Sequence, residues 1–208
     1  MLNKTQTKII IVDCLQHARN EYIVRAKEHV TVILLAAGGS IDGAYTIRLV
    51  GLGARATIVG VAIGKKEEHI SIHTMQRHEA PGTTSDLLVK SVLLDQSQLF
   101  YTGSIRVEKI AQKTDAYQRN ENLLLSEHAR AESKPALEIL ANDVRCTHGA
   151  TISSLSSEHL WYLQTRGIAP EIGKDMLVDG FFHQGIERIF DTMAKKKVQA
   201  FIRRNMYG

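Results

Sequence analysis

Three short runs of residues decide the fold: Thr46-Ile-Arg-Leu-Val50, Ala56-Thr-Ile-Val-Gly-Val-Ala-Ile63 and His69-Ile-Ser-Ile-His73. In the first and third runs apolar residues alternate with polar ones, which is the period of a half-buried β-strand. Glycines and charged residues separate the runs, and no helical pattern long enough to cross between parallel strands lies between them. The sequence therefore predicts consecutive strands joined by short turns.

The same pattern continues along the chain. Similar runs lie at residues 86–90, 104–108, 137–139 and 144–148, and paired apolar residues recur at steps of roughly 11 to 18 residues. A repeat of this size without crossover helices suits a stacked β-solenoid or a β-sandwich. Periodicity alone favours neither of these folds over the other.

The periodicity becomes helical towards the C-terminus. Ser156 is suited to cap the start of a helix that Gly167 would end, and a second helix fits from Pro170 onward. We therefore expect a β domain over residues 1–152 and a helical segment with a basic tail over residues 153–208.

Composition and charge limit the classes of protein. The chain has 208 residues, of which 44% are apolar and 23% charged, a mixture that excludes disordered, collagen-like and coiled-coil proteins. Residues 191–208 carry five cations and one anion, whereas residues 1–190 carry 21 cations and 21 anions. Lysines at a helix end usually compensate the helix dipole and solvate a face, so we expect no nucleic-acid partner.

The cysteines and the apolar runs bear on location. Two cysteines, Cys14 and Cys146, form no disulfide framework, and the sequence opens with no signal-peptide pattern. The apolar stretch over residues 30–37 is far shorter than the roughly 20 residues of a membrane-spanning helix. We expect a cytoplasmic protein without a membrane partner.

A glycine-rich stretch, Gly51-Leu-Gly-Ala-Arg-Ala56, matches the G-x-G-x-x-A pattern of dinucleotide-binding proteins. In those proteins the glycines open a helix that holds the pyrophosphate, whereas a strand pattern follows here. We interpret the stretch as a turn between strands. The sequence also lacks the G-x-x-x-x-G-K-[ST] phosphate loop, so we expect this chain to bind no nucleotide.

Two histidines and a carboxylate, His73, His78 and Glu79, lie close together in the sequence and could hold a transition metal. Residues 73 and 78 would face opposite sides of a strand. Exposed histidines near a strand end are therefore the favoured interpretation.

Cys146 and His148 stand two residues apart in a predicted strand and would point to the same face. A thiolate and an imidazole there could ligate iron or zinc. Two ligands do not complete a metal site, so others would come from another strand, a partner chain or the bound cluster itself. The alternative is a packed cysteine beside a hydrogen-bonded histidine.

A series of motifs follows in a fixed order: His78-Glu-Ala-Pro-Gly-Thr-Thr-Ser85, Gly103-Ser-Ile-Arg-Val107, Gln112-Lys-Thr-Asp-Ala-Tyr-Gln-Arg-Asn120, Lys134-Pro-Ala-Leu-Glu-Ile139, Asn142-Asp-Val-Arg-Cys-Thr-His-Gly-Ala-Thr151 and Tyr162-Leu-Gln-Thr-Arg-Gly-Ile168. The series resembles the core of the SufB/SufD family, whose members are scaffold components of the SUF iron–sulfur cluster assembly machinery. With flanking residues, the resemblance covers most of the chain.

The resemblance implies a right-handed parallel β-helix (β-solenoid) core followed by C-terminal helices. It implies a scaffold, not an enzyme, that dimerises with an identical chain or with a SufB-like subunit. It also implies that the helices dock the ABC-type ATPase SufC, here through Trp161, Tyr162, Arg166, Gly167, Met176 and Phe181.

The resemblance also marks candidate site residues. SufD-type chains carry a histidine at the position of His148, and SufB-type chains carry a catalytic glutamate at the position of Gly149. The cysteine that accepts sulfur in SufB falls near Asn120, where this chain has no thiol. The chain therefore resembles a compact SufD-like member, and the candidate ligands for iron or a transient, nascent cluster are His148, Cys146 and His78.

Two other functions stay open at this stage. A β-helix enzyme acting on carbohydrate would need paired carboxylates on an exposed sheet face, and the acidic residues are scattered. A structural β-solenoid would polymerise end to end through uncapped strand edges.

Overall fold

The computed structural model describes residues 6–15 and 19–208. In this part of the chain a series of strands is followed by helices. The elements are β1 (Gln6–Asp13), β2 (Arg19–Val24), β3 (Glu28–Ala37), β4 (Ile41–Leu49), β5 (Arg55–Gly64), β6 (His69–His78), β7 (Thr84–Leu93), β8 (Gln98–Val107), β9 (Thr114–Leu124), β10 (Arg130–Ile139), β11 (Val144–Ser154), α1 (Ser157–Thr165), α2 (Pro170–Ile186) and α3 (Thr192–Tyr207).

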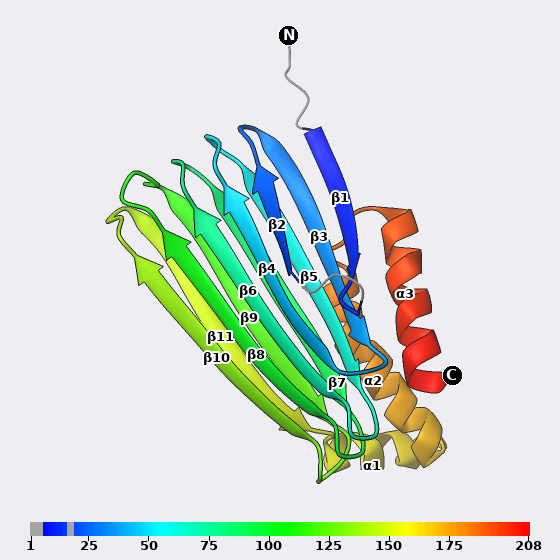
Figure 1. The fold of residues 1–208 in the computed structure, drawn as a ribbon. Coiled ribbons are helices and arrows are strands. Elements are labelled where there is room, and N and C mark those ends of the chain that lie inside the picture. The colour runs from blue at the N-terminus through cyan, green and yellow to red at the C-terminus, as the bar shows by residue number, and fades with distance from the viewer. Residues whose placement is uncertain (1–5, 16–18) are drawn as a thin grey trace.

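The strands form two parallel sheets (Figure 1). Sheet A has the order β1-β3-β5-β7-β9-β11, and sheet B has the order β10-β8-β6-β4-β2. Each strand pairs with the strand two positions along the chain, so the chain winds as a solenoid, whereas the sheets of a sandwich are antiparallel. The predicted β-solenoid is confirmed.

One turn of the solenoid contains a strand of each sheet. Ile41 pairs with Ile70, and Ile70 pairs with Leu99, so one turn takes 29 residues in this region. The spacing of roughly 11 to 18 residues that the sequence shows is therefore a half-turn, from one sheet to the other.

Side chains that point between the sheets form the main core. In β4 buried inward residues alternate with more exposed outward residues, which confirms the period-two pattern of its sequence. Ile47 and Leu49 of this strand belong to one cluster with Val32 and Ile58 of sheet A. Burying each such aliphatic side chain stabilises the fold by about 1.5–3 kcal/mol.

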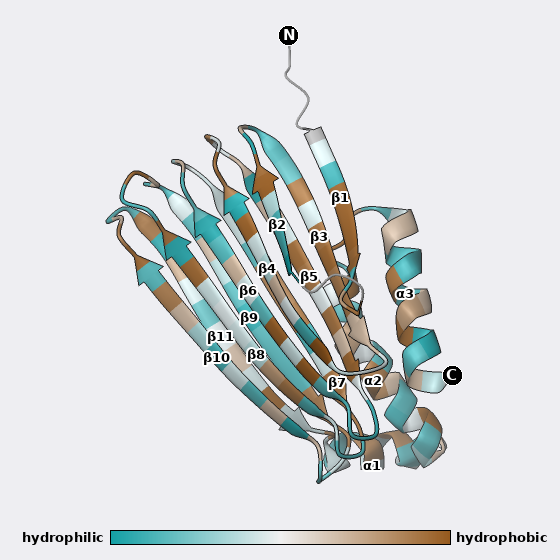
Figure 2. Ribbon diagram, in the orientation of Figure 1, coloured by the Kyte–Doolittle hydropathy of each residue, from teal (hydrophilic) through white to brown (hydrophobic). Residues whose placement is uncertain are grey.

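Helices α2 and α3 cover part of the outer face of sheet A, over β3, β5 and β7 (Figure 1). Val59 and Val61 of β5 share a second core cluster with Phe182 of α2 and Ile202 of α3. Strands β3 and β5 are therefore buried on both faces along most of their length, and their sequences are nearly continuous apolar runs. Figure 2 shows hydrophobic stretches on β1 and β3 beside these helices.

The glycine-rich stretch is a turn between β4 and β5, as predicted. A Cβ atom on Gly51 would lie 1.9 Å from the backbone nitrogen of Ala26, so only glycine fits this approach of two backbone segments. Gly53 has a φ of +66°, a conformation that favours glycine. These glycines therefore allow the tight turn that leads from β4 into β5.

Local signals place the first two helices as predicted. The Ser156 hydroxyl accepts the His159 backbone N–H at 3.3 Å and caps α1. Gly167, with a φ of +79°, follows the end of α1, and Pro170 is the first residue of α2.

The basic residues near the C-terminus belong to a third helix, α3, within the segment that was predicted to be helical. The Asp191 carboxylate caps its start by accepting the Ala194 backbone N–H at 2.7 Å. Val198 and Ile202 are buried towards sheet A, because their spacing places them on one helix face. The exposed cations of α3 lie outside this face, at Lys196, Lys197, Arg203 and Arg204. None of the helices in the described residues is long and apolar enough to span a membrane.

Candidate functional site

The last turn of the solenoid, formed by β10 and β11, has no further turn stacked on it. Each of these strands pairs on one side only, β10 with β8 and β11 with β9. Leu137, Ile139 and Ile152 point towards the core side but are 37%, 39% and 50% exposed. In the preceding turn Ile105, which pairs with Leu137, is fully buried. The described structure therefore ends in an open, partly apolar core.

Cys146 and His148 lie on β11 at this open end, opposite Ala116 and Gln118 of β9. Their spacing places both side chains on the inward face of the strand, as predicted. Cys146 is half-buried and packs against the small apolar cluster that contains Ile105. Burial raises the pKa of its thiol, and the Asp115 carboxylate raises it further, so the thiol is protonated at neutral pH.

His148 is exposed, and the structure shows no hydrogen bond or ion pair of its ring with another described residue. Its imidazole is thus accessible at the open end. In the described part of the chain no three histidine, cysteine, aspartate or glutamate side chains gather closely enough to hold a metal ion. One copy of the chain therefore offers at most the pair Cys146 and His148 at this end.

His78 lies inside the solenoid, so the expectation of exposed histidines near the strand end is wrong for this residue. Its Nδ1 is 2.8 Å from the Thr83 hydroxyl and its Nε2 is 2.9 Å from the Ser85 hydroxyl. Burial lowers its pKa to about 4, so the ring is neutral at pH 7. Both ring nitrogens are engaged, and neither is open to a metal ion in this arrangement.

His73 faces the opposite side of β6 from His78, which confirms the prediction that residues 73 and 78 face opposite sides of a strand. Its Nε2 is 3.9 Å from the Asp42 carboxylate and its ring meets the edge of Phe100. The two histidines therefore do not share a site.

A network of buried amides behind the open end could not be identified from the motifs. Asn122 Nδ2 donates to Asn120 Oδ1 at 2.7 Å and to the Thr151 carbonyl at 3.0 Å. The Ser133 hydroxyl donates to Asn120, so the network joins β9, β10 and β11. The sequence signal for this network is the polar residue at every second position, Gln118, Asn120 and Asn122, because these positions of β9 point inward.

The residues predicted to dock an ATPase fall into two groups. Trp161 and Tyr162 of α1 and Met176 of α2 are 67%, 54% and 50% exposed. Arg166 lies beside this patch, with its guanidinium 5.3 Å from the Tyr162 ring centre, and Gly167 follows it in the turn. Phe181 is different, because its ring faces sheet A.

Phe181 covers a buried ion pair that the sequence analysis missed. The Lys90 Nζ is 4.1 Å from the Phe181 ring centre and 2.5 Å from Glu121 Oε2. Burial lowers the pKa of Lys90, and the hydrogen bond to Glu121 opposes that effect. Arg119 also contacts Glu121, at 2.7 Å. The available signal was Lys90 itself, because it interrupts the apolar run from Leu87 to Leu93 in β7.

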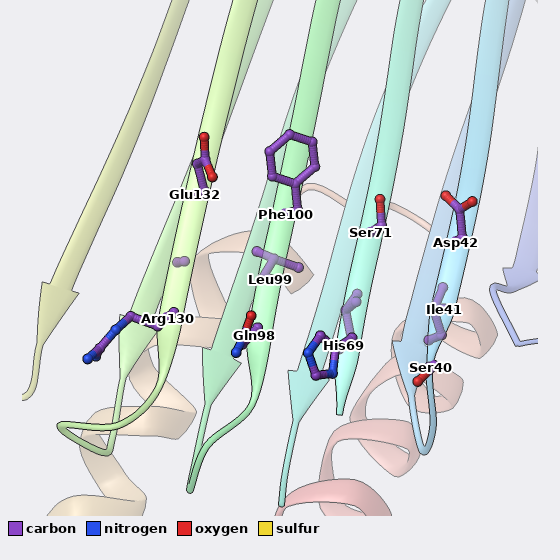
Figure 3. A pocket seen from close by; sticks show the side chains of 12 residues that line it. Ser40, Ile41, Asp42, His69, Ser71, Gln98, Leu99, Phe100, Arg130 and Glu132 are labelled. Atoms are coloured by element: carbon purple, nitrogen blue, oxygen red, sulfur yellow. The ribbon is translucent and has the colours of Figure 1, made fainter. Parts of the chain in front are cut away.

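A hollow of about 660 Å³ lies on the outer face of sheet B, and none of the predicted site residues lines it (Figure 3). Its carboxylates, Asp42 and Glu132, stand at opposite ends, separated in the register by Ser71 and Phe100. Three strand spacings amount to roughly 14 Å, whereas glycosidase carboxylates lie within roughly 10 Å of each other. The hollow does not form the carboxylate pair that a carbohydrate-cleaving enzyme needs.

Comparison with known proteins identifies the family. The family model described as SUF system FeS cluster assembly, SufBD core domain, matches residues 12–181, which include the solenoid from the end of β1 and most of α2. This chain belongs to the SufB/SufD family.

Individual SufB/SufD proteins show the same relationship. The chain is 31% identical to the iron–sulfur cluster assembly protein SufD of Escherichia coli over 174 residues, which cover 84% of this chain and 41% of that protein. It is 29% identical to a SufBD family protein of Synechocystis, with 83% and 41% covered. It is 37% identical to the chloroplastic protein ABCI7 of Arabidopsis thaliana, with 59% and 26% covered. The chain thus spans about two-fifths of the length of the first two relatives.

In this SufB/SufD family member, the candidate residues lie at separate places in the structure. Cys146 and His148 share the open end of the solenoid, whereas Asn120 is buried in the amide network behind it. Two strands of sheet A separate His78 from Cys146. Cys146 pairs with Ala116 of β9, Ala116 pairs with Ser85 of β7, and the Ser85 hydroxyl contacts the His78 ring. The exposed patch on α1 and α2 is a separate surface.

Proposed function

We propose that this chain is a scaffold of SUF-type iron–sulfur cluster assembly and has no turnover of its own. It dimerises through the open end of the solenoid and docks a SufC-type ABC ATPase through its helices. The observation that carries this proposal is the uncapped last turn. Its exposed apolar residues, and an incomplete ligand pair beside them, call for a partner at this end.

The cargo in this proposal is iron or a nascent cluster, held transiently where two subunits meet. Iron in such sites takes thiolate and imidazole ligands, which Cys146 and His148 provide at the open end. Two subunits together bring enough ligands for a four-coordinate site. Because the thiol of Cys146 is protonated when free, loading releases a proton. Both cysteines are free thiols, which suits the reducing cytoplasm where we place the chain.

Anaerobic reconstitution with iron and sulfide tests the ligand assignment. The double variant Cys146→Ala/His148→Ala should bind at most about one-fifth of the iron that the wild-type protein binds, and it should lose its visible absorption. Cys14→Ala is the matched control, because Cys14 is a buried thiol in the first part of the solenoid. Equal iron content in the double variant and the wild type would show that the cargo binds elsewhere.

The ATPase contact is assigned to the exposed patch of Trp161, Tyr162 and Met176. An aspartate in the centre of an apolar contact leaves a charge without water or a counter-ion. Met176→Asp should therefore weaken binding of the purified SufC-type ATPase at least about tenfold in a titration. Met193→Asp, at another exposed methionine on α3, should leave the affinity within about twofold. If only the Met193 variant lost binding, the ATPase contact would lie on α3 and not on the patch of α1 and α2.

A further inference from the structure

Gln118 reaches across the interior of the solenoid, directly behind the open end. It belongs to β9 in sheet A and is 1% exposed. A Cβ atom on Gly103, an inward residue of β8 in sheet B, would collide with Gln118 Nε2. Glycine at position 103 therefore gives the amide of Gln118 the room to cross from one sheet towards the other.

The amide of Gln118 uses only one of its two polar atoms. Its Oε1 accepts an N–H from Gln76 Nε2 at 3.3 Å, whereas Gln118 Nε2 and Gln76 Oε1 are buried without a hydrogen-bond partner in the part of the chain that the structure describes. A buried polar atom without a partner costs free energy, so it needs an explanation. If both amides turn over together, Gln118 Nε2 donates to Gln76 Oε1 and the hydrogen bond between them is kept. Gln118 Oε1 is then the unused atom.

The other two inward amides of β9 are fully engaged. Asn120 Oδ1 accepts from Asn122 Nδ2 at 2.7 Å, and Asn120 Nδ2 donates to the Val89 carbonyl at 3.3 Å. Asn122 Oδ1 accepts from the Ser91 hydroxyl at 2.6 Å. Of the three inward amides of this strand, only that of Gln118 has an atom without a partner among the described residues.

His148 is the nearest residue of the last turn to this unused atom. It lies opposite Gln118 in the register of β11 and β9, and both side chains point inward. Adjacent strands are about 4.8 Å apart, so two long side chains on the same face can meet. In the described structure no further turn is stacked on β11, which leaves the exposed His148 ring free to turn towards the amide.

A histidine that binds a metal ion through one ring nitrogen usually donates the N–H of its other ring nitrogen to an acceptor, which fixes the orientation of the ring. We propose that Gln118 is the positioning residue for His148. Gln118 Oε1 accepts the N–H of one ring nitrogen, so that the other ring nitrogen faces the open end as a ligand of iron or a nascent cluster. The inference rests on the proposed function and adds a residue from the strand behind the ligand pair.

Anaerobic titration of the reduced protein with cobalt(II) tests the inference, because the visible spectrum of bound cobalt reports its ligands. Gln118→Met keeps the length of the side chain but removes the acceptor, so it should weaken cobalt binding at least about tenfold. Gln118→Glu keeps an acceptor oxygen, so its affinity should stay within about twofold of the wild-type value. A merely structural role predicts the opposite order, because a buried carboxyl group is costlier than a thioether. Weaker binding by Gln118→Glu than by Gln118→Met would overturn the inference.

Gln76→Met is the matched control in the same titration. It breaks the same amide pair from the other side and leaves Gln118 beside His148. Its cobalt affinity should stay within about twofold of the wild-type value. If Gln76→Met and Gln118→Met lost affinity equally, the amide pair would act through the packing of the solenoid, and the positioning role would be wrong.

Nuclear magnetic resonance of the protein saturated with zinc gives a second test that does not depend on affinity. In the wild-type protein the ring N–H of His148 should exchange with water at least about tenfold more slowly than that of the exposed His159. Gln118→Met should abolish this protection. Equal exchange of the two rings in the wild-type protein would contradict the hydrogen bond to Gln118.

The variant His148→Ala separates this inference from the proposed function. If His148→Ala leaves the cobalt affinity unchanged, His148 is not a ligand, and the proposed ligand pair is wrong together with the inference. If His148→Ala weakens binding but Gln118→Met does not, only the inference is overturned. If Gln118→Met weakens binding equally in the presence and in the absence of His148, Gln118 does not act through this histidine, which also overturns the inference alone.

Discussion

His78 is a buried titratable residue whose only side-chain partners are hydroxyl groups. Its pKa falls from the ordinary 6.5 to about 4 because burial disfavours the charged ring. The unfolded chain therefore binds this proton more readily than the folded chain. The stability that the neutral ring contributes is fully present above pH 6.5 and is lost as the pH falls towards 4.

Urea unfolding at a series of pH values measures this contribution. The wild-type free energy of unfolding should fall by about 3 kcal/mol more than that of His78→Gln between pH 6.5 and 4. His73→Gln is the control, because His73 lies on the outer face of the same strand. If His78→Gln lost stability as steeply as the wild type, the buried neutral ring would not be the cause.

The sequence predicted single residues well where the local spacing decides their position. Cys146 and His148 share a face because they stand two residues apart in a strand, and this holds whatever the partner strands are. The burial of His78 could not be predicted in the same way. It depends on which face of β6 meets the other sheet and on hydroxyl groups from a later turn and strand, at Thr83 and Ser85.

At the scale of elements, α2 is seated on sheet A over the Lys90–Glu121 pair. Breaking a buried ion pair leaves one charge without its partner, whereas replacing both members with apolar residues removes that penalty. Glu121→Leu should therefore lower the free energy of unfolding by about 3 kcal/mol, and Lys90→Met/Glu121→Leu should recover most of the loss.

Denaturant unfolding of these variants provides the measurement, with an exposed ion pair as the control. Glu138, which pairs with Arg106 at 3.1 Å, lies at the surface, and Glu138→Leu should change stability by less than about 1 kcal/mol. A loss for Glu121→Leu no larger than that of Glu138→Leu would show that the pair under Phe181 does not hold α2.

The helices show why some elements were predicted and another was not. α1 and α2 have local signals, at Ser156, Gly167 and Pro170, that act within a few residues of the helix end. α3 also has a capping residue, Asp191, but its lysine run resembles a solvated tail. Its apolar face becomes informative only when sheet A is present to cover it.

At the scale of the whole molecule, the sequence predicted strands within β4 to β8, β10 and β11, but it did not distinguish a solenoid from a sandwich without the family resemblance. An alternating pattern predicts that one face of a strand is buried, but it does not predict which strand lies beside it. The division into a domain of residues 1–152 and a segment of residues 153–208 stays a prediction. The cluster that joins Val59 with Phe182 and Ile202 shows that strands and helices share part of the core.

The open end of the solenoid is the feature on which the account of function depends. Its exposed apolar residues should bind a partner chain, and an aspartate there should prevent this. Ile152→Asp changes such a residue on β11, and Leu52→Asp is the matched control, at an exposed leucine in the turn between β4 and β5.

Sedimentation equilibrium of the purified chain over a wide range of concentrations is the most direct measurement. We predict a closed dimer, formed by the chain alone or with an added SufB-like subunit, that does not grow further, that Ile152→Asp converts to a monomer and that Leu52→Asp leaves intact. A wild-type chain that stays monomeric at every concentration, both alone and with a SufB-like subunit, would contradict this prediction, and so would a polymer that grows with concentration.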